Sequence, residues 1–230
     1  MKITHLVVAA YTDLVKFSNG LLEESKIGEI SDTIHRYAMF SAVASSFMLM
    51  PGFGSLAAAL AQTGLVWGTY VAINKVIGIN LSQNVMKFVG SAMLTNLATN
   101  ASSYVLAYVG AIVLTIIPGA NLLAIPLLGA MGYILIYASA IIYLKLLTKV
   151  FRTTGGFNLD DSDKTRDMID ETVKGSDIEE IIKEGRDNFN AAKNSGEFKE
   201  ARKNPRCPSC GYAVKKDQRY CSNCGCHLSK

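Results

Sequence analysis

The chain has 230 residues, with 23 basic and 19 acidic side chains, a formal net charge of +4, and 50% hydrophobic residues. This length allows one sizeable domain and a small module, and excludes a chain of several large domains. No Asp or Glu occurs between Asp32 and Asp160. A water-soluble domain of this size would carry acidic side chains over its whole surface, so we expect most of this stretch to lie in a membrane.

The N-terminal residues predict an amphipathic helix from Ile3 to Phe17, because apolar side chains recur there at helical spacing. This helix could lie on the bilayer surface or pack against its own protein, and the sequence does not decide between the two. Residues 1–36 form this helix and a polar connector. No cleavable signal peptide is evident, because Asp13 and Lys16 interrupt the short apolar core.

Residues 37–152 predict a membrane domain of two helical hairpins. Pro51-Gly-Phe-Gly54 breaks the first, and Ser55–Asn74 then supplies about 20 uncharged residues, enough to cross the roughly 30 Å hydrocarbon core at helical rise. From Phe88 to Leu144 there is no charged residue or histidine. We expect a break near residues 96–103, a second reversal at Pro118–Pro126, and a returning helix from Leu127 to Leu144.

Basic residues near the ends of these segments predict the topology. Neither proline-glycine turn carries a charge, whereas all the basic residues that flank the segments fit one side of the membrane: Arg36, Lys75, Lys87, Lys145, Lys149 and Arg152. Because basic residues accumulate on the cytoplasmic side, we expect a multi-pass protein of the cytoplasmic membrane with both termini in the cytoplasm. The limb before Pro51 is short, so the first hairpin either spans fully or is re-entrant.

Small residues at helical spacing predict a close helix–helix contact in the second limb. Four of them share one face: Ala57, Ala61, Gly64 and Gly68. Such residues let backbones approach closely where lipid supplies no hydrophobic driving force between helices. This face serves packing within the hairpin or self-association into a homo-oligomer.

Asn96 and Asn100 lie four residues apart and therefore face the same way on a helix, with Ser and Thr residues nearby. In lipid these polar groups need partners. We expect hydrogen bonds between helices, and the alternative is the lining of a hydrated pore.

Residues 153–203 form a linker rich in both acidic and basic side chains, which predicts helices in contact with water. Ser176-Asp-Ile-Glu179 has the pattern of a capping box at the start of one helix. Ile178, Ile181, Ile182 and Phe189 then form an apolar stripe. The stripe packs on its own protein, with Met168–Val173 as the expected neighbour, or docks a protein partner.

Residues 204–230 predict a small zinc ribbon. Two Cys-x-x-Cys pairs supply four thiolates at the spacing typical of tetrahedral structural zinc: Cys207, Cys210, Cys221 and Cys224. Cys226 is an additional thiol. A module this short cannot bury a core, so bound Zn²⁺ must supply most of its folding free energy. Metal-binding thiolates also require a reducing compartment, which agrees with a cytoplasmic tail.

The zinc-ribbon segment is strongly basic, since Asp217 is the only acidic residue between Arg202 and Lys230. We expect it to contact a protein or anionic lipid first, with RNA or DNA as a weaker candidate because only Tyr212 and Tyr220 could stack on bases.

Residues 38–147 resemble the domain-of-unknown-function family 697. Three segments carry the resemblance: Pro51-Gly-Phe-Gly54 followed by Gln62, Gly68–Gly78, and Ile116-Ile-Pro-Gly-Ala120. The resemblance implies a helical, membrane-associated bacterial domain, often joined to Era-like GTPase domains and without established catalytic residues. This chain contains no GxxxxGK[ST] phosphate loop, so a GTPase would have to act in trans.

Together these features predict an all-helical membrane domain with a charged helical stalk and a cytoplasmic zinc ribbon. We interpret the chain as an anchoring or interaction protein, and an accessory role to a GTPase is compatible with this interpretation. The alternative is an oligomeric channel-forming or membrane-permeabilising protein. No enzyme is predicted, because the sequence offers no nucleophile with its base, no open catalytic metal site and no phosphate cradle.

Overall fold

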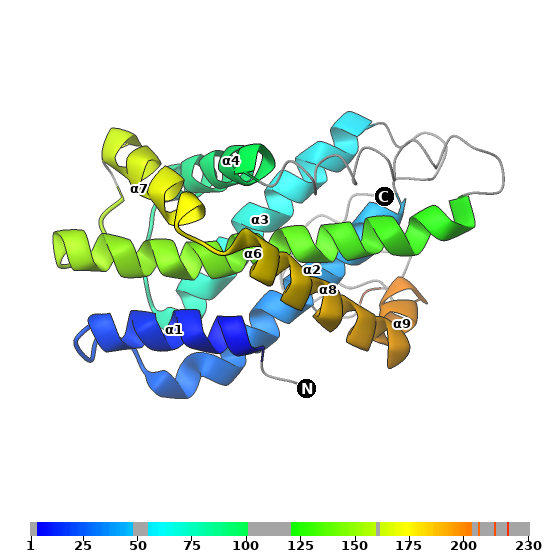
Figure 1. The fold of residues 1–230 in the computed structure, drawn as a ribbon, viewed down its shortest axis with the longest axis horizontal. Coiled ribbons are helices and arrows are strands. Elements are labelled where there is room, and N and C mark those ends of the chain that lie inside the picture. Colours follow the sequence, from blue (N-terminus) through cyan, green and yellow to red (C-terminus); the bar gives the residue numbers. More distant parts are fainter. Residues whose placement is uncertain are drawn as a thin grey trace.

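A computed structural model describes residues 4–47, 55–100, 121–159 and 162–203, and the single positions 207, 214 and 220, without the side chains of residues 47, 55–62 and 121–124. Within these residues the fold is helical, as predicted, with no strand among the elements (Figure 1). The helices are α1 (His5–Phe17), η1 (Glu24–Lys26), α2 (Ile27–Phe47), α3 (Ser55–Ile77), α4 (Gln83–Asn100), α6 (Asn121–Thr154), α7 (Ser162–Lys174), α8 (Ile178–Asn194) and α9 (Glu197–Lys203).

Helix α6 is the central element of the bundle. It runs along the long axis of the molecule, and α1, α2, α3, α7 and α8 all contact it (Figure 1). Its 34 residues correspond to about 51 Å at the rise of an α-helix. Nearly every side chain from Leu128 to Phe151 on this helix is buried or half-buried. The core of the described structure is therefore organised around one long apolar helix.

The most extensive helix–helix contact joins α2 to α6. Gly132 of α6 faces Ser41 and Ser45 of α2 so closely that a Cβ atom added to it would lie 2.6 Å from the Ser41 carbonyl oxygen and 2.2 Å from the Ser45 Oγ. The Ser41 hydroxyl donates a hydrogen bond of 2.7 Å to the Gly132 carbonyl oxygen. Only a glycine allows the two backbones to come this close.

The N-terminal helix α1 is confirmed, and its apolar face packs against its own protein. It contacts α6 and α2 and buries Val7, Ala10, Tyr11 and Leu14. The Tyr11 hydroxyl donates a hydrogen bond of 2.8 Å to the Glu23 carbonyl oxygen beyond the turn that follows α1. Helix α2 then runs without interruption through the predicted boundary after Arg36.

Helices α3 and α4 follow the predicted charge pattern. Helix α3 begins at Ser55, after the Pro51–Gly54 segment, and ends where Gly78 adopts a φ of 75° and the Ile79 N–H donates to the Asn74 carbonyl oxygen at 2.9 Å. This is a glycine-based C-cap, which satisfies a carbonyl at the helix end. Helix α4 continues through Asn96 to Asn100 with no break, and the remainder of the predicted break lies outside the described residues.

The start of the last apolar helix differs from the prediction. We expected Pro126 to close the turn and the helix to begin at Leu127, but α6 already includes Asn121 and contains Pro126. Pro126 is the sixth residue of α6, where it removes one backbone hydrogen bond and its ring crowds the carbonyl four residues back, and the helix nevertheless continues through it. Pro118 and Gly119 lie outside the described residues.

The charged linker is helical, as expected, and its three helices lie on the bundle. Helix α7 contacts α4 and α6, α8 contacts α6, and α9 contacts α2 and α8. In Figure 1, α8 crosses over α6. The predicted capping box is wrong by one residue: the Asp177 carboxylate accepts the Glu180 N–H at 2.9 Å, while the Ser176 hydroxyl donates to the Thr172 carbonyl oxygen of α7 at 2.7 Å. Ser176 thus ends one helix and Asp177 caps the next.

Candidate membrane helix and zinc site

Within the described ranges, one helical segment is long and apolar enough to cross a membrane. It extends from Ile125 to Thr154; its most apolar window of 18 residues has a mean hydropathy of 2.0, and 72% of that window is buried inside the protein. Length and composition alone do not distinguish such a helix from the core helix of a water-soluble protein. The multi-pass arrangement of two hairpins therefore stays a prediction.

The Tyr143 hydroxyl of α6 is paired inside the bundle. The Tyr143 hydroxyl donates to the Asn74 Oδ1 at 2.8 Å, and the Asn74 Nδ2 donates to the Met86 sulfur at 3.2 Å. The Tyr143 ring stacks on Tyr70 of α3 with centroids 4.1 Å apart. One tyrosine of α6 thus joins α3 and α4 through a buried chain of hydrogen bonds, which suits a helix whose surroundings exclude water.

The middle of the charge-free part of α6 is covered by α8 and α9. A Cβ atom added to Gly185 of α8 would lie 3.1 Å from the Tyr137 ring and 3.6 Å from the Ile134 Cα. Phe189 of α8 packs against Tyr133, with ring centroids 5.9 Å apart. The apolar stripe of α8 therefore rests on its own protein, as one interpretation predicted, although its neighbour is α6 and not Met168–Val173.

Helix α9 extends this cover to the next turn of α6 and to α2. The Phe198 ring lies over Gly129, where an added Cβ atom would be only 2.9 Å from the ring, and it packs edge-on against Phe189 with centroids 5.2 Å apart. We call α8 and α9 together, residues 178–203, the covering helices. Four aromatic side chains and two glycines thus form one continuous apolar contact across the middle of α6.

Two polar contacts tie the covering helices to the N-terminal part of the chain. His35 of α2 forms one hydrogen bond with the Tyr133 hydroxyl, at 2.7 Å, and another with the Glu197 carboxylate of α9, at 2.8 Å. The Glu184 carboxylate of α8 accepts the Leu6 N–H at the start of α1, at 3.2 Å and 3.3 Å from its two oxygens. These contacts join residues far apart in the sequence, so no local pattern could predict them.

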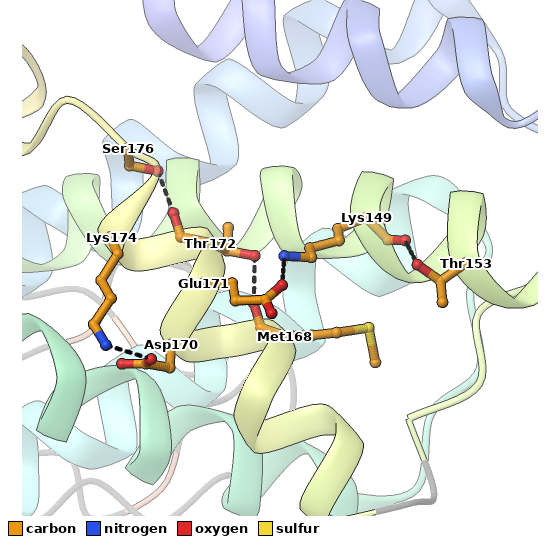
Figure 2. A network of polar contacts seen from close by, with 8 residues as sticks. All are labelled: Lys149, Thr153, Met168, Asp170, Glu171, Thr172, Lys174 and Ser176. Atoms are coloured by element: carbon orange, nitrogen blue, oxygen red, sulfur yellow. Dashed lines mark hydrogen bonds and ion pairs between the residues drawn. The ribbon is translucent and has the colours of Figure 1, made fainter.

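Helix α7 is fixed separately, near the C-terminal end of α6. Figure 2 shows the ion pair between Lys149 of α6 and Glu171 of α7, and the hydrogen bond of 2.9 Å from the Thr153 hydroxyl to the Lys149 carbonyl oxygen. The Arg166 guanidinium lies over the Phe88 ring of α4, 5.8 Å from its centroid. Helix α7 therefore contacts α4 and the charged C-terminal end of α6, and these contacts do not involve the apolar middle of α6.

The outer face of α8 is strongly charged. Six ionisable side chains of this helix are exposed: Glu179, Glu180, Lys183, Arg186, Asp187 and Lys193. Large apolar side chains that are exposed among the described residues are scattered at Leu21, Val71, Leu127 and Tyr220. The covering helices thus present a surface to water while their inner face holds the apolar surface of α6.

The small residues that we predicted as a packing face are only partly in contact. A Cβ atom on Gly68 would lie 3.2 Å from the Tyr37 ring of α2, whereas one on Gly64 would meet no such neighbour within 4 Å among the residues that the structure describes. The side chains of Ala57 and Ala61 lie outside the described part of the chain. The closest small-residue contact is instead that of Gly129 and Gly132 with α2, which the sequence signals by two glycines three residues apart.

The asparagines of α4 use their own helix as partner. The Asn96 side-chain amide donates to the Ala92 carbonyl oxygen at 3.1 Å, and that of Asn100 donates to the Asn96 carbonyl oxygen at 2.8 Å. Our expectation that these amides bond between helices is therefore wrong. Asn96 is half-buried and Asn100 is exposed. A role in lining a pore stays untested.

The predicted zinc site falls almost entirely outside the described residues. Cys207 is described and is buried, whereas Cys210, Cys221, Cys224 and Cys226 are not. In the part of the chain that the structure covers, no three metal-binding side chains come together. The four thiolates of the sequence fit tetrahedral Zn²⁺ by their chemistry, and the site stays a prediction.

Comparison with known proteins gives no match: no family model, no curated protein sequence and no solved structure is similar to this chain. The fold class of the protein is therefore taken from the described structure alone. In its described residues the protein is all-helical and is built around one long apolar helix, against which the amphipathic helices α1 and α8 pack.

Proposed function

We propose that the chain is a membrane-anchored interaction protein that presents a zinc ribbon in the cytoplasm. The observation that carries this proposal is the segment Ile125–Thr154, a continuous helix whose length and hydropathy suit a membrane span. It belongs to a stretch of sequence from Phe88 to Leu144 that has no charged side chain. Lys145, Lys149 and Arg152 follow directly, where basic residues anchor a span at the cytoplasmic interface.

The same logic extends the proposal to the other charge-free segments. Two helical hairpins that enter from the cytoplasm, the first turning at 51–54 and the second just before α6 begins at Asn121, place every flanking basic residue on one side. Both chain ends are then cytoplasmic. The α2–α6 contact supports such a bundle, because small residues and a Ser41–Gly132 hydrogen bond hold helices together in lipid as well as in water.

The function of the tail is to bind a partner. Cys207, Cys210, Cys221 and Cys224 would hold Zn²⁺, which would supply the folding free energy of a module too short for a core of its own. Its basic surface suits an acidic protein or anionic lipid, with nucleic acid as the weaker candidate. We propose a GTPase acting in trans as the protein partner; this rests on the sequence resemblance to family 697 alone, since no family model matches the chain.

Alkaline carbonate extraction of cells that express the full chain tests the anchoring. We expect the protein to stay in the membrane pellet, and we expect protease to remove the tail from inside-out vesicles but not from right-side-out vesicles. Release of the protein into the carbonate supernatant would refute the proposal. Tail cleavage in right-side-out vesicles would refute the cytoplasmic orientation alone.

A further inference from the structure

The covering helices occupy the surface of α6 that a membrane would have to occupy. Gly185 and Phe189 lie against Ile134, Tyr137 and Tyr133, in the middle of the candidate span. Phe198 lies over Gly129, nearer to its start. The inference that follows rests on the proposed function, because it concerns how this same helix reaches a bilayer.

Lipid and the covering helices exclude one another at this surface. Six charged side chains of α8 are exposed, on the helix that packs against Ile134, Tyr137 and Tyr133 of the candidate span. If α6 crossed a bilayer with α8 in place, these charges would lie in hydrocarbon, where ionised groups are strongly disfavoured. The arrangement in Figure 1 is therefore compatible with water around α8, and a membrane-spanning α6 requires α8 to be elsewhere.

The joints of the chain allow such a separation. Helix α7 keeps its own anchorage through Lys149 and Glu171 and does not depend on the middle of α6. The joint between α7 and α8 is short and consists of Gly175, Ser176 and Asp177. At the other end, the Glu197 side chain that bonds His35 is about half exposed, so water can replace this contact.

We infer that α8 and α9 form a removable cover, and that the acyl chains of a bilayer replace them on α6. In the closed form the covering helices keep α6 buried and the protein compatible with water. In the inserted form they lie outside the hydrocarbon, joined to the bundle through α7. The cover thus carries the zinc-ribbon segment with it, so that insertion also repositions the tail.

A pair of introduced cysteines distinguishes the two forms in the full-length protein. The variant Ile134→Cys with Gly185→Cys joins α6 to α8, where an added Cβ on residue 185 lies 3.6 Å from the Cα of residue 134, close enough for a disulfide. The control variant Trp67→Cys with Gly90→Cys joins α3 to α4, at a Cβ–Cβ distance of 3.9 Å. Four further variants, each with only one of these introduced cysteines, reveal any cross-linking to the native cysteines of the tail.

Each variant is synthesised in a cell-free system, with and without liposomes of phosphatidylethanolamine and phosphatidylglycerol, then oxidised and extracted with carbonate. We expect the 134–185 disulfide to form in the aqueous protein. In the carbonate-resistant protein, the fraction of chains that carry this disulfide should be lower by about tenfold or more, because the population has shifted from the closed to the inserted form. The 67–90 disulfide should form equally in both fractions. Mass spectrometry of the linked peptides identifies each bond.

Equal 134–185 cross-linking in the two fractions would overturn the removable cover and leave the membrane anchoring intact. The closed form would be overturned if the 134–185 disulfide did not form in aqueous protein while the control variant formed its 67–90 disulfide under the same conditions. If no protein resists carbonate extraction, the proposed anchoring itself fails, and the inserted form fails with it. Each failure is therefore distinguishable from the others.

Discussion

The close contact between α2 and α6 makes a direct prediction about Gly132. In Gly132→Ala, the new methyl group would lie 2.6 Å from a backbone oxygen of Ser41 and 2.2 Å from the Ser45 Oγ. The Ser45 hydroxyl can rotate away, but the Ser41 carbonyl cannot move without shifting the whole of α2 against α6. Overpacking of this kind costs about 1–3 kcal/mol, so we expect Gly132→Ala to lower the free energy of unfolding by about that amount.

Gly64→Ala is the matched control, because it makes the same chemical change at a site where, within the described part of the chain, no atom other than those of the adjoining helix backbone lies within 4 Å of the new methyl group. Alanine is the better helix former, so this variant should gain about 0.5–1 kcal/mol. For a chain of this size each kcal/mol shifts the melting temperature by about 2–4 °C. The two variants should therefore differ by several degrees in opposite directions.

Thermal unfolding followed by the fluorescence of Trp67, the single tryptophan, measures both variants. Trp67 lies on α3 and faces Gly90 of α4, so its fluorescence reports on the packing of α3 against α4 in the bundle. Equal melting temperatures for Gly132→Ala and Gly64→Ala would contradict the close α2–α6 contact. A second substitution, Ser45→Ala, should rescue Gly132→Ala only slightly, because the Ser41 carbonyl stays in the way.

Further predictions concern the tail, the buried polar chain and α1. The full chain should bind one Zn²⁺, measured by elemental analysis, and Cys210→Ser should abolish this while Cys226→Ser preserves it; zinc retention in Cys210→Ser would argue against the ribbon. Tyr143→Phe leaves the side-chain Oδ1 of Asn74 buried without its donor and should lower the free energy of unfolding, measured by chemical denaturation, by about 1–3 kcal/mol. Burial, with a smaller effect of Glu23, raises the pKa of Tyr11 to about 12. Because the neutral phenol is favoured in the folded state, this stability is complete below pH 10 and is lost as the pH rises through 12. Tyr11→Phe should flatten that alkaline loss, and an unchanged pH profile would exclude Tyr11 as its cause.

Local sequence patterns predicted the helices well where charge and helix-breaking residues agree. Helix α3 begins directly after the Pro51–Gly54 segment, and its last residues include Lys75, as a charge-bounded apolar segment implies. The same rules failed at Pro126, because a proline near a helix start and a proline in a turn look alike in sequence. They failed by one residue at Ser176, because Ser and Asp are equally good caps and the choice depends on Thr172 of the preceding helix.

Partners distant in the sequence could not be predicted in this way. The stripe on α8 was evident from its spacing, but nothing local indicates that Phe189 packs on Tyr133 and not on α7. The hydrogen bonds of His35 with Tyr133 and Glu197 join three separate parts of the chain. The spacing of Asn96 correctly placed it on a helix, but not its hydrogen-bond partner. Its short side chain reaches a carbonyl oxygen of its own helix, that of Ala92.

The two principal contacts of α6 should respond differently when water is replaced by lipid. The cover depends on burying Phe189 and Phe198, and the hydrophobic effect that favours this burial exists only in water. The α2–α6 contact depends on van der Waals packing at Gly132 and on the Ser41 hydrogen bond, both of which persist in lipid. Transfer to a bilayer therefore weakens the cover and leaves the α2–α6 pair joined. On this reasoning Phe198→Ala should destabilise only the closed form, whereas Gly132→Ala should destabilise the protein in both environments.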